Sequence, residues 1–157
     1  LFNIDVNQID ALIHPESIVH GLVEFNDTST HAFLSQPTME ISISSVLFDD
    51  NSVDLNKFHL DLKTIKTLNF YEIDDQKFNS INLAKKSINY GGLAPSVLNY
   101  TNELMVDLFL QKKILFTDIV INNEKLLNQF ITEGNNSIDL NIDNIKQSFA
   151  IVDGYLD

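Results

Sequence analysis

Short runs of β-branched and apolar residues occupy positions 11–36 and are typical of β-strands. The runs "SIVHGLVEF" and "HAFLSQ" flank "NDTST", which favours a turn because its polar side chains can hydrogen-bond to nearby backbone. Pro15 has no backbone N–H, so it interrupts the strand that begins with "ALI" or places it at a sheet edge. The pattern predicts a β-hairpin, and a short helix or a loop is expected after it over residues 39–47.

From residue 80 onward the apolar positions recur at helical spacing. A first helix is expected from Ser80 to Gly91–Gly92, because glycine readily adopts the left-handed conformation that ends a helix. Pro95 fits the first turn of a second helix, where its missing N–H has no consequence. The second helix should bury one continuous face, formed by Val97, Leu98, Thr101, Leu104, Met105, Leu108 and Phe109.

Two more helices are predicted. Thr117 is the expected N-cap of a third helix, which continues to Phe130 in one or two pieces and is ended by "TEGNNS". A fourth helix is expected over residues 142–156, weakened at Gly154. Helices joined by connections this short predict a small bundle.

The predicted fold class is α+β, with a short antiparallel hairpin followed by a C-terminal helical bundle. We predict a β-rich part over residues 1–48, a polar but ordered connector over 49–78 and the bundle over 79–157. The 157 residues, 44% of them hydrophobic, suffice for one compact domain or for one domain and a piece of another. Leu1 is not methionine and the sequence opens as if within a domain, so we expect the tail of a longer protein.

Composition excludes several classes of protein. The formal net charge of −12 disfavours binding to nucleic acid or to an anionic membrane, since both require Lys and Arg to neutralise phosphates. No apolar run approaches the roughly 20 residues that span a bilayer. The absence of cysteine excludes disulfides and thiolate metal sites. Neither GxGxxG nor GxxxxGK[ST] occurs, so no nucleotide-binding loop is predicted.

The segment "DALIHPESIVHGLVEFND" gathers two imidazoles, a carboxylate and a hydroxyl. On an unbroken strand, His14 and His20 would lie about 20 Å apart, which is too far for one metal ion. Only a sharp bend at Pro15 would bring them together, and His31 would have to approach His20 across the hairpin. Ser17 lacks the GxSxG turn and oxyanion segment of a nucleophile. We favour hydrogen-bonded polar residues over a metal or nucleophile site here.

Three polar residues interrupt the apolar face of the second helix. Asn99 and Glu103 are four positions apart, so they can hydrogen-bond to one another, cap a neighbouring helix or line a site, and Asn102 lies beside them. Buried polar groups normally find hydrogen-bond partners, so we favour a structural network.

Several segments, in this order, carry a resemblance to a known family: "LFNIDVNQIDALIHPESIVHGLVEF", "LSQPTM", "INLAKKSINYGG", "PSVLNYTNE" and "FTDI". Together they resemble the C-terminal portion of 1-deoxy-D-xylulose 5-phosphate reductoisomerases, from Leu1 to about Phe130. Residues 1–48 would then end an α/β catalytic domain. The resemblance implies an NADPH-dependent oxidoreductase that uses Mg²⁺ or Mn²⁺. It would convert the phosphorylated sugar 1-deoxy-D-xylulose 5-phosphate to 2-C-methyl-D-erythritol 4-phosphate in non-mevalonate isoprenoid biosynthesis, the MEP pathway.

The resemblance also implies a homodimer and a cytoplasmic location in a bacterium, with a plastid-type organelle as the alternative. The family's metal carboxylates and Gly-rich cofactor motif would lie before Leu1. We therefore expect enzymatic activity in the complete protein only. The chain alone should bind neither NADPH nor a metal ion, and it should be inactive.

Four residues match family positions at the active site. Ser17 and His20 match an SxxH motif, and Pro37 and Met39 match a loop that borders the substrate and cofactor cleft. The resemblance thus predicts these four as a substrate-pocket wall, with no complete catalytic, cofactor-binding or metal set in this chain. It assigns Asn99, Asn102 and Glu103 to architecture. Of the two histidines, it makes His20 the functional candidate and His14 the structural one.

Two departures from the family pattern leave alternatives open. "PTMEIS" stands where the family has Pro-Asp-Met followed by Arg and Pro, and "LFDDNS" stands where it has Trp-Pro. One alternative is a diverged, non-catalytic dimerisation or interaction fragment. Another is a small metal-dependent hydrolase that uses His14, Glu16 and His20.

Overall fold

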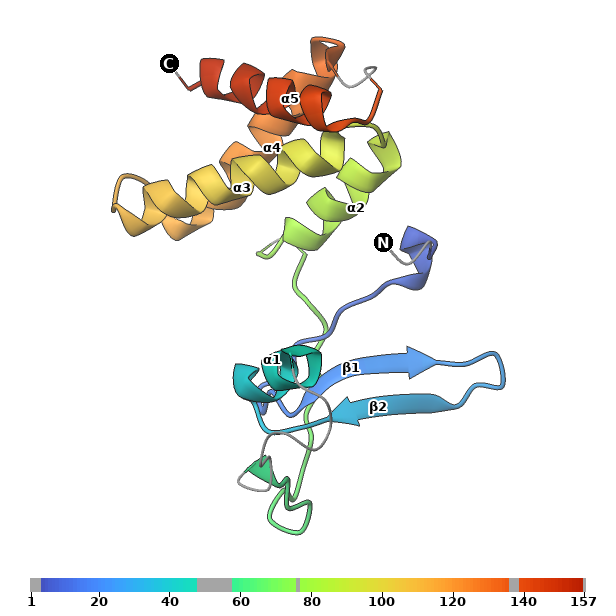
Figure 1. Ribbon diagram of the computed structural model, residues 1–157. Coiled ribbons are helices and arrows are strands. Elements are labelled where there is room, and N and C mark those ends of the chain that lie inside the picture. Colours follow the sequence, from blue (N-terminus) through green and yellow to red (C-terminus); the bar gives the residue numbers. More distant parts are fainter. Residues whose placement is uncertain (1–3, 48–57, 76, 136–138, 157) are drawn as a thin grey trace. The chain divides into compact units, whose positions relative to one another are not determined.

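The computed structural model describes residues 4–47, 58–75, 77–135 and 139–156, and Figure 1 labels its elements. Contacts between residues divide the chain into two compact units. The hairpin unit is Asp10–Ile73, and the helical unit is Asp74–Asp157 together with Leu1–Ile9. The α+β class predicted from the sequence is confirmed. The expected boundary between residues 48 and 49 lies outside the described residues.

Two strands, β1 (Val19–Glu24) and β2 (Thr30–Leu34), form the predicted antiparallel hairpin. Its turn is held by Asp27, whose carboxylate accepts hydrogen bonds from the backbone N–H and the hydroxyl of Ser29 at 2.9 and 2.6 Å. Helix α1 (Met39–Leu47) follows over the residues predicted for it. The polar turn residues therefore act as the sequence pattern indicates, by hydrogen-bonding locally.

The segment before β1 pairs with the connector. Ile13 and Tyr71 form a single antiparallel bridge with two backbone hydrogen bonds of 2.9 Å. A strand was predicted over "ALI", but only Ile13 pairs, in a single bridge. The pairing goes no further because Pro15 has no backbone N–H to donate to a β-ladder and a turn follows it. Within the described part of the connector, Tyr71 thus joins the hairpin unit through backbone hydrogen bonds, as expected of an ordered segment.

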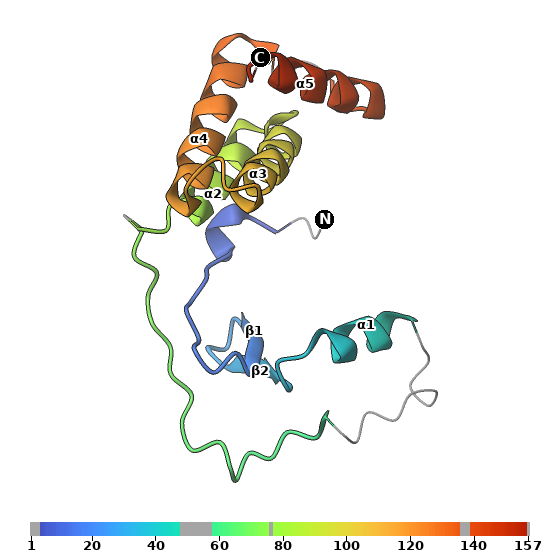
Figure 2. The same ribbon diagram turned by 90° about the vertical axis from the view of Figure 1, so that its left-hand side faces the viewer.

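Helices form most of the helical unit, in which α3 packs against α2, α4 and α5 (Figures 1 and 2). They are α2 (Ser80–Tyr90), α3 (Ala94–Leu110), α4 (Phe116–Thr132) and α5 (Ile142–Gly154), preceded by one 3-10 turn, η1 (Val6–Gln8). Side chains with almost no exposed surface fill the space between them: Leu93, Val97, Met105, Leu127, Phe130 and Val152. None of the helices formed by the described residues is long and apolar enough to cross a membrane.

The helix ends follow the sequence signals with one exception. Helix α2 ends at Gly91, whose φ of 66° is left-handed, and Pro95 lies in the first turn of α3, both as predicted. The predicted N-cap Thr117 is wrong, because α4 already begins at Phe116 and Leu115 is its N-cap. The Asp118 carboxylate accepts a hydrogen bond from the Leu115 N–H at 2.8 Å, so an acidic residue in the first turn takes over the capping role. Helix α4 is continuous.

Candidate functional site

A pocket of about 420 Å³ lies in the hairpin unit. Three short segments line it, and their residues are Leu12, His14, Ser17, Val19, His20, Pro37, Thr38 and Met39. The structure therefore brings all four residues predicted from the family motif to one concave surface. These residues span more than twenty positions of sequence.

The bend at Pro15 explains how the first segment reaches the pocket. His14–Ser17 is a tight turn in which the Ser17 N–H donates to the His14 carbonyl at 3.0 Å. Ser17 has a φ of 52°, a left-handed conformation that is uncommon for a residue other than glycine. The turn places Ser17 next to the start of β1, so that both histidines line the same pocket, as only such a bend would allow.

A β-bulge turns His20 toward the pocket. Val19 is opposite Leu34 and Gly21 is opposite Phe33, so His20 is the extra residue of β1. Such a bulge re-aims a side chain that regular alternation would place on the other face. The approach of His31 to His20 considered from the sequence is wrong, since His31 pairs with Val23 in the ladder.

The loop between β2 and α1 supplies the apolar side of the pocket. Thr38 donates its N–H to the Gln36 carbonyl at 2.8 Å, and its hydroxyl accepts from the Glu40 N–H at 3.2 Å. These contacts start α1 and leave Met39 with 71% of its surface exposed. Pro37 and Met39 therefore present apolar surface beside a serine and a histidine, a mixture typical of ligand pockets.

His14 is held more tightly than its neighbours in the pocket. Its side chain is only 8% exposed, and its ring stacks on Phe70 at a centroid distance of 4.8 Å. Nδ1 lies 2.8 Å from the Asn69 carbonyl and 3.1 Å from Glu16 Oε2, so it must carry a proton and donate to these acceptors. Nε2 is buried without a hydrogen-bond partner in the described part of the chain.

Glu16 is fixed by the same connector segment. Its two carboxylate oxygens accept hydrogen bonds from the backbone N–H and the side-chain amide of Asn69. The Asn69 amide lowers the pKa of Glu16, and the further hydrogen bonds and His14 act in the same direction. The role of Asn69 and Phe70 was missed from the sequence, since no local pattern links them to a segment 53 residues earlier.

The described residues do not fit a resident metal ion. Nowhere among them do three or more His, Asp or Glu side chains gather as a ligand group. His14 and Glu16 are in contact, but no hydrogen bond or ion pair joins His20 to either of them within the same residues. The hydrolase alternative requires such a three-ligand set.

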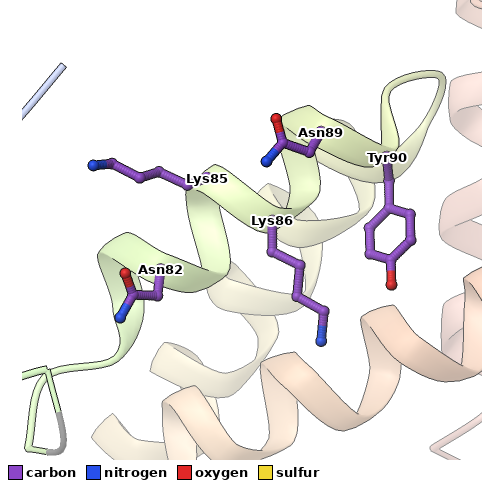
Figure 3. A pocket seen from close by; sticks show the side chains of 5 residues that line it. All are labelled: Asn82, Lys85, Lys86, Asn89 and Tyr90. Atoms are coloured by element: carbon purple, nitrogen blue, oxygen red, sulfur yellow. The ribbon is translucent and has the colours of Figure 1, made fainter. Parts of the chain in front are cut away.

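A second hollow, of about 360 Å³, follows one face of α2 (Figure 3). Its lining residues are Asn82, Lys85, Lys86, Asn89 and Tyr90. Lys86 points toward α4, where its Nζ lies 3.2 Å from Glu124 Oε1, whereas Lys85 points to the other side. Among the described residues, the lining of this hollow consists of two lysines, two asparagines and a tyrosine, and it includes no carboxylate and no histidine.

The polar residues of α3 take part in structural contacts. Asn99 donates to Glu103 at 3.3 Å on the same helix, which is one of the arrangements expected from their spacing. Asn102 accepts a hydrogen bond at 3.0 Å from Asn123 of α4. These pairs connect turns and helices, in agreement with an architectural role.

Comparison with known families decides the relationship of the chain. The model of the DXP reductoisomerase C-terminal domain matches residues 34–150. The chain belongs to this family. The resemblance found in the sequence is thereby confirmed.

Relatives extend the match beyond the DXP reductoisomerase C-terminal domain. The 1-deoxy-D-xylulose 5-phosphate reductoisomerase of Sulfurihydrogenibium sp. is 39% identical over 154 residues, which are 98% of this chain and 39% of the relative. That of Persephonella marina is 41% identical over 129 residues, covering 82% of this chain and 35% of the relative. The chain thus spans well under half the length of these relatives. An alignment of 154 residues in a chain of 157 includes Ser17 and His20, which precede the family match.

Solved structures of DXP reductoisomerases share the fold. The Zymomonas mobilis enzyme in complex with NADPH superimposes with a TM-score of 0.76 at 31% identity, over 98% of this chain and 39% of its own. A DOX-P reductoisomerase in complex with NADPH, fosmidomycin and magnesium gives 0.83 at 32% identity, over 92% of this chain and 36% of its own.

Proposed function

We propose that this DXP reductoisomerase C-terminal region forms one wall of the substrate pocket of a complete reductoisomerase. That enzyme would convert 1-deoxy-D-xylulose 5-phosphate to 2-C-methyl-D-erythritol 4-phosphate. The observation that supports the proposal is the pocket itself. Ser17, His20, Pro37 and Met39 were each matched to the family from sequence motifs, and they line one hollow.

The side chains of the pocket suit a polar sugar phosphate. The Ser17 hydroxyl and the His20 imidazole can each donate or accept hydrogen bonds, as hydroxyl and phosphate groups require. Pro37 and Met39 add apolar surface to the same pocket. In the proposed enzyme, NADPH would supply hydride and a divalent ion would polarise substrate oxygens, and the residues of this chain would bind and orient the substrate.

We further propose that the chain alone binds neither NADPH nor the metal ion and is inactive. The sequence has no Gly-rich loop to hold a pyrophosphate. A hard divalent cation needs several oxygen ligands, and the carboxylates of the described residues are not gathered for that purpose. The substrate wall would then depend on other parts of an enzyme for its chemistry.

Two measurements test the proposal. Fluorescence titration of the 157-residue chain with NADPH should give no saturable binding. Tight binding would contradict the proposal that the chain contributes to the substrate pocket but holds no cofactor site of its own. In the complete enzyme that carries this chain, His20→Ala should lower kcat/KM by about 100-fold through lost substrate orientation. His31→Ala is the matched control, because His31 lies on the same hairpin but does not line the pocket. Equal effects of the two changes would contradict the proposed role.

One observation favours an interaction role as the second candidate. The hairpin exposes Leu22, Val23 and Phe33 by 44, 44 and 62%, and a two-stranded sheet is marginally stable by itself. A homodimer that covers these strands would bury that surface. Light scattering on the preparation used for the NADPH titration distinguishes the roles, since a monomeric chain would remove the dimerisation candidate.

A further inference from the structure

The Ser17 backbone is strained at the edge of the candidate pocket. Its φ of 52° is left-handed, and such a conformation persists in a residue other than glycine only where its surroundings impose it. The turn hydrogen bond from Ser17 N–H to the His14 carbonyl, at 3.0 Å, closes the turn but does not anchor it to anything else. Other contacts must therefore hold the turn in place.

The connector segment 69–71 supplies those contacts on both sides of Pro15. Before the proline, Ile13 and Tyr71 exchange two backbone hydrogen bonds of 2.9 Å. After it, the Glu16 carboxylate accepts from the backbone N–H of Asn69 at 3.2 Å and from its side-chain amide. Asn69 is therefore bonded to the pocket turn through its N–H and its side chain.

The same residue also holds His14. The Asn69 carbonyl accepts from His14 Nδ1 at 2.8 Å, so all three polar groups of Asn69 are used on the turn. Glu16 keeps 24% of its side-chain surface exposed, and its carboxylate is bonded chiefly to Asn69. Hydrogen bonds to an ionised group are roughly twice as strong as neutral ones, so this pair is suited to impose a conformation.

We propose that Asn69 and Glu16 are positioning residues, which hold the turn at Ser17 and so aim Ser17 and His20 into the substrate pocket. The inference rests on the proposed function of that pocket. Neither residue lines the pocket, and each acts through the turn. Asn69 lies four residues before Ile73, where the hairpin unit ends, so the positioning contact is made by the stretch of chain that leads into the helical unit.

The structural half of the proposal is tested on the 157-residue chain by NMR. In Asn69→Ala, the Cα and Cβ shifts and the three-bond HN–Hα coupling of Ser17 should leave the values of a left-handed residue. Asn99→Ala is the matched control, since that amide also donates to an exposed carboxylate but lies in α3. Unchanged Ser17 signals in Asn69→Ala would overturn the proposal.

Asn69→Asp provides a second variant if Asn69→Ala does not fold. It sets a carboxylate against Glu16, and the repulsion should displace Ser17 at neutral pH. Acidification should return the Ser17 signals toward the wild type once the two carboxyl groups share a proton. His14 is the other titratable group in contact with Glu16, and it is present in both proteins, so the wild type measured at the same pH values is the reference. If the Ser17 signals of Asn69→Asp do not change with pH, the proposal is overturned.

The functional half is tested in the complete enzyme that carries the chain. Asn69→Ala should raise KM and lower kcat/KM by about tenfold with an unchanged unfolding midpoint, because a misplaced wall weakens orientation without unfolding the protein. Unchanged kinetics with displaced Ser17 would overturn the positioning role. In that case a damaging His20→Ala shows that only the positioning role fails, whereas a silent His20→Ala shows that the pocket assignment fails as well.

Discussion

The two units of the chain are stabilised in different ways. In the helical unit, side chains such as Val97, Leu127 and Phe130 have no exposed surface. In the described part of the hairpin unit no residue with an assigned exposure reaches that state, and Phe33 and Met39 are 62 and 71% exposed. Burial of apolar surface is the dominant favourable contribution to folding, so the helical unit has what a self-sufficient domain needs. The hairpin unit must rely on hydrogen bonds and on surfaces that cover it.

The candidate site lies in the hairpin unit, which has no buried core among its described residues, and this determines which substitutions should change the geometry of the site. A wall built on a packed core is rigid because neighbouring side chains leave it no space. Here the turn at Ser17 is held by polar contacts from Asn69 and Glu16 and by the stacking of His14 on Phe70. The geometry of the pocket should therefore be sensitive to single hydrogen bonds, whereas the helical unit should be sensitive to single cavities.

The largest expected effect contrasts two phenylalanines. Phe130→Ala should destabilise the helical unit by about 3–5 kcal/mol, because it leaves a cavity in a fully packed core. Phe33→Ala is the matched control and should change stability far less, since 62% of Phe33 is already exposed. Urea unfolding followed by circular dichroism measures both. Similar losses in the two variants would show that the hairpin unit has more packing than its exposed surface indicates.

A smaller contrast concerns left-handed residues. The helical unit places glycine at Gly91, with φ 66°, whereas the hairpin turn uses Thr28 at φ 70°. Gly91→Ala should cost about 1 kcal/mol from backbone strain alone, because an added Cβ would meet no atom within 4 Å. Thr28→Asn should instead stabilise the hairpin by up to about 1 kcal/mol, as Asn tolerates this conformation better than a β-branched residue. Urea unfolding measures the effect of Gly91→Ala, and hydrogen exchange of the β1 and β2 amides measures that of Thr28→Asn. Lower protection of these amides in Thr28→Asn would contradict the proposed backbone strain at Thr28.

The same contrast explains how far sequence reasoning succeeded. Local signals predicted local structure: glycine at 91 ended α2, and "NDTST" formed the hairpin turn. Thr117 failed as an N-cap because Asp118, with a charged acceptor, competes for the same end of α4. The contribution of Asn69 to the pocket was not predictable, because its hydrogen bond to Glu16 joins residues 53 positions apart and produces no periodic pattern in the sequence. Motif matching did place Ser17 and His20 together, but neither their left-handed turn nor the bulge was predictable from local pattern.

The smallest effect tests whether polar contacts matter less where a core supports them. Tyr155 donates a 2.6 Å hydrogen bond to Glu133, which lowers the pKa of Glu133 below its usual 4.5. Burial, together with this hydrogen bond, raises the pKa of Tyr155 to about 12. The lowered carboxyl pKa stabilises the fold above the unfolded value of 4.5 and ceases to do so as pH falls through the folded value. The raised phenol pKa stabilises it below the unfolded value of 10.0 and ceases to do so as pH rises toward about 12.

Tyr155→Phe should therefore lower the urea midpoint of the helical unit only slightly, with the difference from the wild type largest between about pH 5 and pH 9 and shrinking on both sides. Glu133 is solvent-exposed, so solvent screening should keep the loss of stability in Tyr155→Phe smaller than the changes expected for Gly91→Ala and Thr28→Asn. Asn99→Ala is the control, because it removes an exposed hydrogen bond between an amide and a carboxylate but leaves Glu133 and Tyr155, the two groups with shifted pKa values, unchanged. A pH-independent difference would mean that Tyr155 acts through its packing against the buried clusters and not through its hydroxyl. A large difference would mean that polar contacts govern the helical unit as they govern the hairpin unit, and the contrast between the two would fail.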